Sequence, residues 1–187
     1  MNCLHPRTIK NPLFGKFKNA AGELVKPGQN TRDRFMDVPC GRCLNCLTNR
    51  QNDWSMRLDY ESRYYQNRSW FVTLTYDDEH LVYSYHVDRK EYESTKIDPE
   101  TGEQLPTLDK AEVSNFVRRL ARVRPGLLEK YFFCGEYGDK FGRPHYHGIL
   151  FLSEEMSSED LQRILVKVWN RSDEYQVQVD RVSVAAM

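Results

Sequence analysis

The sequence has no long apolar run, no net charge and no internal repeat. No stretch approaches the roughly 18 apolar residues of a membrane-spanning helix, and the first residues, MNCLHPRTIKNP, lack the apolar segment that a signal peptide contains. We therefore expect no membrane association and a cytoplasmic protein. The 187 residues, of which 40% are hydrophobic and 12% aromatic, are instead typical of one globular domain with a small appendage.

The charges cancel over the whole chain but are unevenly spread along it. Residues 1–70 carry 12 Lys and Arg against 6 Asp and Glu, whereas residues 71–187 carry 15 against 21. A basic amino-terminal third is compatible with a surface that binds phosphate groups. Solvated helices are often locally basic too, so the charge alone does not decide the partner.

The order of expected elements predicts an α+β fold. Turn-rich sequence makes residues 1–39 irregular, and a helix over 44–66 would place Leu47, Trp54, Leu58 and Tyr65 near one stripe. The other expected elements are strands at 70–76 and 81–87, a polar hairpin or loop at 88–108, a helix at 109–123 capped by Asp109, a strand hairpin at 131–152, a helix at 157–169 with a Ser157/Asp160 capping box, and a strand at 175–182. Consecutive hairpin strands favour a central antiparallel sheet with flanking helices.

The segment YFFCGEYGDKFGRPHYHGILFL, residues 131–152, contains the most specific pattern of the chain. Alternation along the second strand places His145 and His147 on one face and turns Tyr146 toward the other, where it would pack in the core. A hairpin would bring Glu136 beside them. Two imidazoles and one carboxylate can hold a metal ion and leave coordination positions open for a substrate. A pair of strand histidines without a ligand is the alternative.

Three neighbours of this pattern are candidate contacts for a phosphate-containing ligand. Thr73 and Thr75 share one face of the strand WFVTLTY, and Arg143 directly precedes the histidine strand. Threonine is also a common strand former, and an arginine in a turn is often only solvated.

The cysteines predict a second metal site. Cys40, Cys43 and Cys46 have the spacing C-x2-C-x2-C, and Cys3 is available as a fourth thiolate for a tetrahedral zinc site. His5 could replace Cys3, the same spacing occurs in iron–sulfur proteins, and reduced thiols without metal remain an alternative. Disulfides are not expected in a cytoplasmic protein. We expect the remaining cysteine, Cys134, in the core.

A zinc site at these cysteines would anchor the basic amino-terminal surface. Arg42, Arg50 and Arg57 are then candidates for contacts with the DNA backbone, and a solvated helix face is the alternative for all three.

These motifs resemble those of a known family. CGRCLNC, then FVTLTYDDEH, then GEYGDKFGRPHYHGILF are similar in kind and order to the HUH-endonuclease replication initiation proteins of microvirus (gokushovirus) single-stranded DNA bacteriophages. The resemblance runs from about Cys3 to Val182. It implies an enzyme that nicks one strand of single-stranded or locally melted origin DNA, in a host bacterial cytoplasm and beside the host replication machinery.

The family's mechanism assigns roles to residues of this sequence. A divalent cation, Mg²⁺ or Mn²⁺, would be held by His145, His147 and Glu136, and a tyrosine would attack the scissile phosphate to form a 5′-phosphotyrosine. In the family that tyrosine lies on a helix after the last strand. Here SVAAM, with Ser183 as its cap, would begin that helix, so we expect a fragment that lacks its nucleophile and stays inactive by itself.

The sequence thus predicts residues 1–46 as an irregular segment with a four-cysteine metal knot and residues 47–187 as an HUH-type endonuclease domain. Two other classes of function are left open. One is a non-catalytic, zinc-stabilised nucleic-acid-binding module in which the histidines are incidental. The other is a non-haem iron oxygenase, which also uses two histidines and a carboxylate.

Overall fold

The chain divides into two compact units, which we call unit 1 (Met1–Leu58) and unit 2 (Asp59–Met187). The computed structural model describes residues 3–19, 21–24, 32–138, 142–173 and 176–182. The division lies inside the helix α2 (Leu44–Tyr65). The functional division predicted at residues 46 and 47 stays a prediction.

Unit 1 contains a short hairpin where the sequence predicted only irregular structure. Strand β1 (Arg7–Lys10) pairs antiparallel with β2 (Phe35–Val38). The prediction was wrong because turn-rich sequence lies between the two strands and each strand is only 4 residues long. Such short segments carry too few alternating positions to be recognised as strands.

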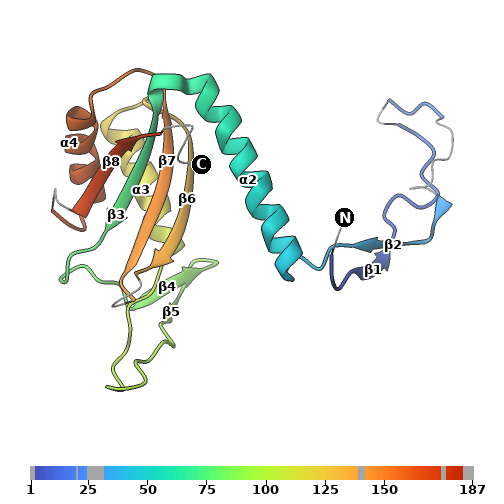
Figure 1. Ribbon diagram of the computed structural model, residues 1–187, viewed down its shortest axis with the longest axis horizontal. Coiled ribbons are helices and arrows are strands. Elements are labelled where there is room, and N and C mark those ends of the chain that lie inside the picture. The colour runs from blue at the N-terminus through green and yellow to red at the C-terminus, as the bar shows by residue number, and fades with distance from the viewer. Residues whose placement is uncertain (1–2, 20, 25–31, 139–141, 174–175, 183–187) are drawn as a thin grey trace. The chain divides into compact units, whose positions relative to one another are not determined.

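Unit 2 is a two-layer α+β structure, as predicted (Figure 1). Its elements are η1 (Gln66–Arg68), β3 (Ser69–Thr75), β4 (Ser84–Val87), β5 (Lys90–Glu93), α3 (Lys110–Val123), β6 (Leu128–Tyr137), β7 (Pro144–Leu152), α4 (Ser158–Trp169) and β8 (Val177–Arg181). Four strands form an antiparallel sheet in the order β6-β7-β3-β8, and β4 and β5 form a separate hairpin within the predicted polar segment.

Helices α3 and α4 cover one face of the sheet, and the core lies between them. From the sheet it contains Trp70, Val72, Leu74, Tyr146, Leu150, Leu152 and Val177, and from the helices Phe116, Leu120, Leu161, Leu165, Val168 and Trp169. Tyr146 is 3% exposed and therefore lies in the core, as predicted. The other face of the sheet carries the histidines and is called the histidine face below.

The helix starts expected from the sequence are confirmed. The Asp109 carboxylate accepts a hydrogen bond from the Ala111 backbone N–H at 2.9 Å. The Asp160 backbone N–H donates to the Ser157 hydroxyl at 3.1 Å, and that hydroxyl donates to the Asp160 carboxylate at 2.8 Å. These caps satisfy N–H groups that have no partner inside the helix.

The apolar stripe predicted on α2 is buried only at its carboxyl end. Tyr65 is 3% exposed and packs against Phe151, whereas Leu47 and Trp54 are 48% and 42% exposed. The helical period predicts which residues share a face, but it does not show whether another element covers that face.

A close approach of two strands explains a glycine within β7. Gly148 lies opposite Phe133 of β6, and a Cβ atom at this position would be 2.3 Å from the Phe133 ring. We expect Gly148→Ala to lower the free energy of unfolding by about 1–3 kcal/mol through overpacking. Urea denaturation measures the change. Gly138→Ala is the matched control, because its nearest new contact would be at 3.7 Å. Equal midpoints for the two variants would contradict this explanation.

Candidate metal centres

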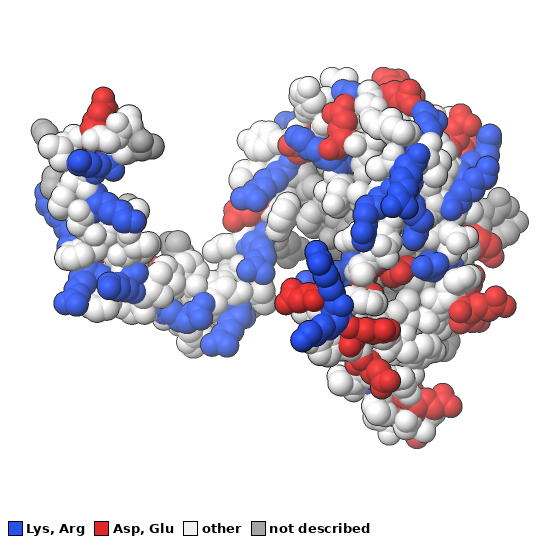
Figure 2. All heavy atoms as spheres, turned by 180° about the vertical axis from the view of Figure 1, so that it is seen from behind, with Lys and Arg blue, Asp and Glu red and all other residues white. Residues whose placement is uncertain are grey.

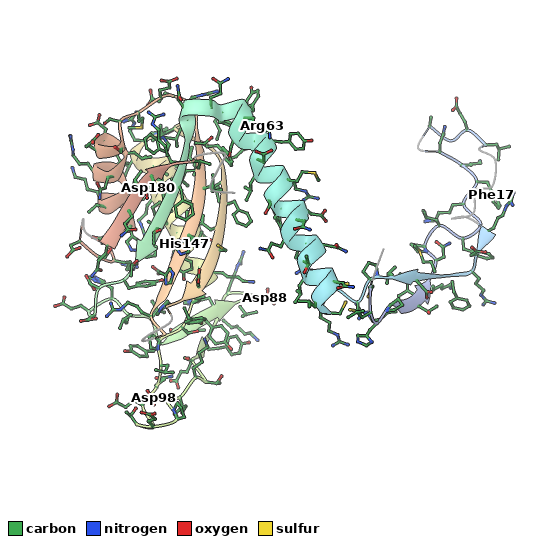
Figure 3. All side chains as sticks on the ribbon, in the orientation of Figure 1. Phe17, Arg63, Asp88, Asp98, His147 and Asp180 are labelled. Carbon is green, nitrogen blue, oxygen red and sulfur yellow. The ribbon has the colours of Figure 1, made fainter. Side chains whose placement is uncertain are left out.

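The sheet brings His145, His147 and Glu136 together on the histidine face, as predicted. His145 pairs with Glu136 across β7 and β6. The Nε2 atoms of His145 and His147 are 3.1 Å apart, and the Glu136 carboxylate is 3.5 Å from Nε2 of His147. The ligand atoms of the three residues all lie within 4.8 Å of one another. In Figure 3 His147 lies over the middle strands of the sheet.

These distances fit one bound cation. Two nitrogens that are each about 2.1 Å from an ion and at right angles around it are about 3.0 Å apart. The two imidazoles therefore already have the separation of neighbouring ligands. The Glu136 side chain is 61% exposed, so it can adjust toward an ion.

The second nitrogen of each ring has a partner that can orient it. Nδ1 of His145 is 3.2 Å from the Arg143 carbonyl oxygen, which can only accept a hydrogen bond. Nδ1 of His147 is 3.1 Å from the Thr73 hydroxyl. When both Nδ1 atoms carry the proton, both Nε2 lone pairs point at the shared centre.

The electrostatics of the site favour a neutral His147. Burial of the ring lowers the pKa of His147, and the neighbouring His145 lowers it further, against the opposing effect of Glu136. A neutral imidazole is the form that binds a metal ion.

The three predicted DNA contacts have different surroundings. Thr73 lies opposite His147 and bonds to it, whereas Thr75 lies opposite His145 on the same face. The Arg143 guanidinium donates to the Tyr76 carbonyl oxygen at 2.8 Å and also pairs with Asp78. Their contact with DNA stays a prediction.

Two further residues belong to the histidine face. Cys134 lies opposite His147 and is exposed, so its predicted place in the core was wrong. Alternation from Glu136 along β6 could have placed it on this face. Phe71 stacks on the His147 ring at 5.4 Å, and the threonine strand WFVTLTY already set it beside Thr73.

The four-cysteine cluster forms in unit 1. The Sγ atoms of Cys3 and Cys43 are 3.8 Å apart, those of Cys40 and Cys46 are 4.0 Å apart, and all four lie within 4.8 Å of one another. Four sulfurs about 2.3 Å from a single ion at tetrahedral angles would be about 3.8 Å apart. Among the described residues the group contains Cys3 and does not contain His5.

The backbone around the cysteines supports thiolates. The Cys40 N–H points at the Cys3 sulfur and the Cys43 N–H at the Cys40 sulfur, each at 3.3 Å. Hydrogen bonds from the backbone N–H groups of Leu4 and Cys46 lower the pKa of the Cys43 thiol to about 6. Gly41 allows the tight turn between the first two cysteines of the motif because its φ is +77°.

No helix among the described residues is long and apolar enough to cross a membrane.

Comparison with known proteins identifies relatives of the whole arrangement. A family of replication-associated proteins, described under the name ORF2, matches residues 69–185. Replication-associated protein ORF2 of Spiroplasma virus 4 is 30% identical over 173 residues, which are 88% of this chain and 48% of the relative. Replication-associated protein VP4 of Bdellovibrio phage phiMH2K is 29% identical over 160 residues, 81% of this chain and 41% of the relative. No solved structure matches the chain significantly.

A third relative, replication-associated protein ORF4 of Chlamydia phage 1, is 31% identical over 131 residues, 68% of this chain and 27% of the relative. The chain thus spans about half or less of the length of these curated relatives. The family match covers all four strands of the main sheet and both histidines. The chain therefore belongs to this family of replication-associated proteins, as its resemblance to microvirus replication proteins predicted.

Proposed function

We propose that this chain carries the metal-binding core of a replication initiator that nicks one strand of origin DNA. The observation that supports this most is the convergence of His145, His147 and Glu136 on the open face of the sheet, in a chain of a replication-associated family. An incidental pair of histidines has no need for two nitrogens that face each other at 3.1 Å.

Each residue of the site has a separate task in this proposal. His145 and His147 hold a divalent cation, Mg²⁺ or Mn²⁺, through Nε2, and Glu136 supplies a carboxylate oxygen. The bound cation would polarise the scissile phosphate and stabilise the charge that develops on it. Thr73 keeps the His147 ring oriented through Nδ1. Thr75, next to His145 on the same face, is left to contact the DNA backbone.

Arg143 could add a phosphate contact only by changing partners. Its pairing with Asp78 places an exposed carboxylate where a phosphate would bind, and the Asp78 side chain is 84% exposed. A DNA phosphate can therefore replace this carboxylate at little cost, while the bond to the Tyr76 carbonyl holds the guanidinium in place.

We propose that the nucleophilic tyrosine comes from outside the described residues. The tyrosines of the four-stranded sheet, Tyr131, Tyr137 and Tyr146, alternate with the ligands and lie on the opposite face. Tyr137 also bonds through its hydroxyl to the Leu108 backbone N–H at 3.1 Å. Ser183, the predicted cap of a tyrosine helix, lies outside the described residues.

The test is cleavage of a labelled single-stranded origin oligonucleotide. We expect residues 1–187 alone to give no covalent protein–DNA product, and a chain extended to the length of its relatives to give one in Mn²⁺ or Mg²⁺. His145→Ala/His147→Ala in the extended chain should remove the product. Cleavage that survives this double substitution, or that needs no divalent cation, would overturn the proposal.

Thr73 offers a test of the orienting bond. Thr73→Val keeps the shape of the side chain but removes the hydroxyl beside Nδ1 of His147. We expect Mn²⁺ affinity to fall roughly 10- to 100-fold, the usual effect of losing a residue that orients a metal ligand. Calorimetry measures it. Thr73→Ser should restore most of the affinity, and equal affinities of Val and Ser variants would contradict the role.

The four-cysteine cluster supports a structural zinc ion in unit 1. Its short sulfur separations fit a single ion better than an iron–sulfur cluster, in which the thiolates bind different irons and stand farther apart. This site also favours the second candidate function, a zinc-stabilised module that binds nucleic acid without cleaving it. Oligonucleotide binding with no cleavage by the extended chain would support that alternative.

A further inference from the structure

We propose that unit 1 contains a second nucleic-acid site, a groove beside the first turns of α2 that binds single-stranded DNA. The groove lies entirely within unit 1, and its lining includes Gly41, Asn49, Arg50, Asn52, Trp54 and Arg57. The choice of DNA as ligand rests on the proposed function, whereas the groove and its chemistry do not. It shares no residue with the histidine site.

Trp54 presents an indole ring at this groove. It is 42% exposed, whereas the other two tryptophans of the chain, Trp70 and Trp169, are 1% and 0% exposed. The Arg57 guanidinium lies over the ring, 5.3 Å from its centroid. An exposed indole beside an arginine is the combination on which unpaired bases stack while a phosphate is neutralised nearby.

The charges of unit 1 match a polyanion. Residues 1–58 contain ten Lys and Arg against four Asp and Glu. Lys and Arg side chains predominate on the face of unit 1 that Figure 2 shows. In the groove, Arg50 and Arg57 are seven residues apart on α2, which separates them by about 10 Å along the helix. Asp53 is the acidic residue between them, and Asn49 and Asn52 add amide donors and acceptors.

The four-cysteine cluster holds one wall of the groove. Gly41 and Cys46 belong both to the metal knot and to the lining. A Cβ atom on Gly41 would be 4.0 Å from Nη2 of Arg50, so this guanidinium lies over the turn of the knot. The position of Arg50 therefore depends on a folded, metal-loaded cluster, and DNA binding by the groove should depend on it as well.

The ligand is single-stranded because an indole can stack only on a base whose face is free. In a duplex the base faces are covered by neighbouring pairs, and binding would be limited to phosphate contacts. The groove should thus favour an oligonucleotide without secondary structure, and it should do so with little preference for sequence.

The experiment titrates zinc-loaded protein with oligo(dT) and with a duplex of equal length, and follows tryptophan emission and anisotropy of the labelled DNA. We expect oligo(dT) to quench the emission of Trp54. Trp54→Phe should abolish the quenching but keep most of the affinity, since a phenyl ring still stacks. Trp54→Ala should weaken binding roughly tenfold.

The arginines are tested by the salt dependence of binding. Arg50→Ala/Arg57→Ala should lower the slope of log affinity against log salt by about 1.4, because each phosphate contact to a single strand contributes about 0.7. The control is Arg63→Ala, because Arg63 lies further along α2 and pairs with Asp59 at 2.9 Å. It should leave the slope unchanged. Zinc content and circular dichroism verify that each variant is folded.

Three results would overturn the inference. They are unchanged affinity in both the Trp54→Ala and the double-arginine variants, equal affinity for the duplex without quenching, and sedimentation as a dimer that Trp54→Ala dissociates. The last would assign the groove to a second copy of the chain. His145→Ala/His147→Ala should leave the Trp54 quenching intact, so loss of cleavage and loss of groove binding can be told apart.

Discussion

Removal of the metal from the four-cysteine cluster is expected to unfold unit 1 and to leave the sheet of unit 2 folded. Among the described residues of unit 1 only Asn11, Cys40 and Cys46 are buried. Leu13, Phe14, Phe35 and other large apolar side chains of this unit are about half exposed. A unit with so little buried apolar surface cannot offset its chain entropy, so a structural metal must stabilise it.

The expected change is large and local. A chelator that strips zinc should turn unit 1 from mostly folded to mostly unfolded, and proteolysis within residues 1–58 should speed up by roughly a hundredfold because cleavage follows the population of the open form. Backbone NMR of the same sample should retain the dispersed signals of β3, β6, β7 and β8, whose core is formed by unit 2 alone.

A matched pair of cysteine variants separates metal loss from loss of a thiol. Cys43→Ser removes one ligand of the cluster and should reproduce the effect of the chelator, with less than one zinc per chain. Cys134→Ser changes the exposed thiol on the histidine face and should keep both zinc and unit 1. A Cys43→Ser protein that resists protease as the unchanged chain does would show that the cluster holds no structural metal.

Replacement of both histidines is expected to abolish binding of Mn²⁺ at the sheet. His145→Ala/His147→Ala removes two of the three side chains that converge there, and Glu136 alone is an exposed carboxylate. Calorimetry or manganese relaxation should show at least a hundredfold loss of affinity, since outer residues that only orient a ligand already account for roughly 10- to 100-fold. In an extended, active chain, strand cleavage should fall roughly a thousandfold, which corresponds to several kcal/mol of transition-state stabilisation.

The control for this experiment is a double substitution of histidines outside the sheet. His5→Ala/His80→Ala removes the same number of imidazoles from exposed positions and should leave Mn²⁺ affinity unchanged. The zinc content of both double variants should stay equal, because the two metal centres share no residue. Identical Mn²⁺ binding in all three proteins would remove the histidine pair from the mechanism, and the DNA-binding module would become the leading function.

The sequence predicted much of the histidine face because a strand has a strict period of two. His145 and His147 had to share a face, Tyr146 had to turn away from it, and the Gly/Pro turn brought Glu136 back beside them. Local rules were as reliable at the helix starts, since the capping by Asp109 and Ser157 involves residues only two or three positions apart.

Other features depended on how strands pair, which local pattern does not encode. Thr73 orients His147 because β3 lies beside β7 in one particular register, although the two residues are 74 positions apart. The exposure of Cys134 was missed for a related reason, because helices cover only the opposite face of the sheet. A hydrophobic side chain in a strand can be placed on a face from sequence, but burial depends on what covers that face.

By itself, the sequence determined the α+β class, the family and the two sets of candidate ligands, because these follow from short-range periodicity and from motifs in a given order. Only the tertiary structure decided that Cys3 joins Cys40, Cys43 and Cys46, the nearest of which is 37 positions away along the chain, and that Trp54 stays exposed beside Arg57. Contacts between distant segments form when chain entropy is offset by packing or metal binding over the whole unit, and that balance cannot be found in any single segment.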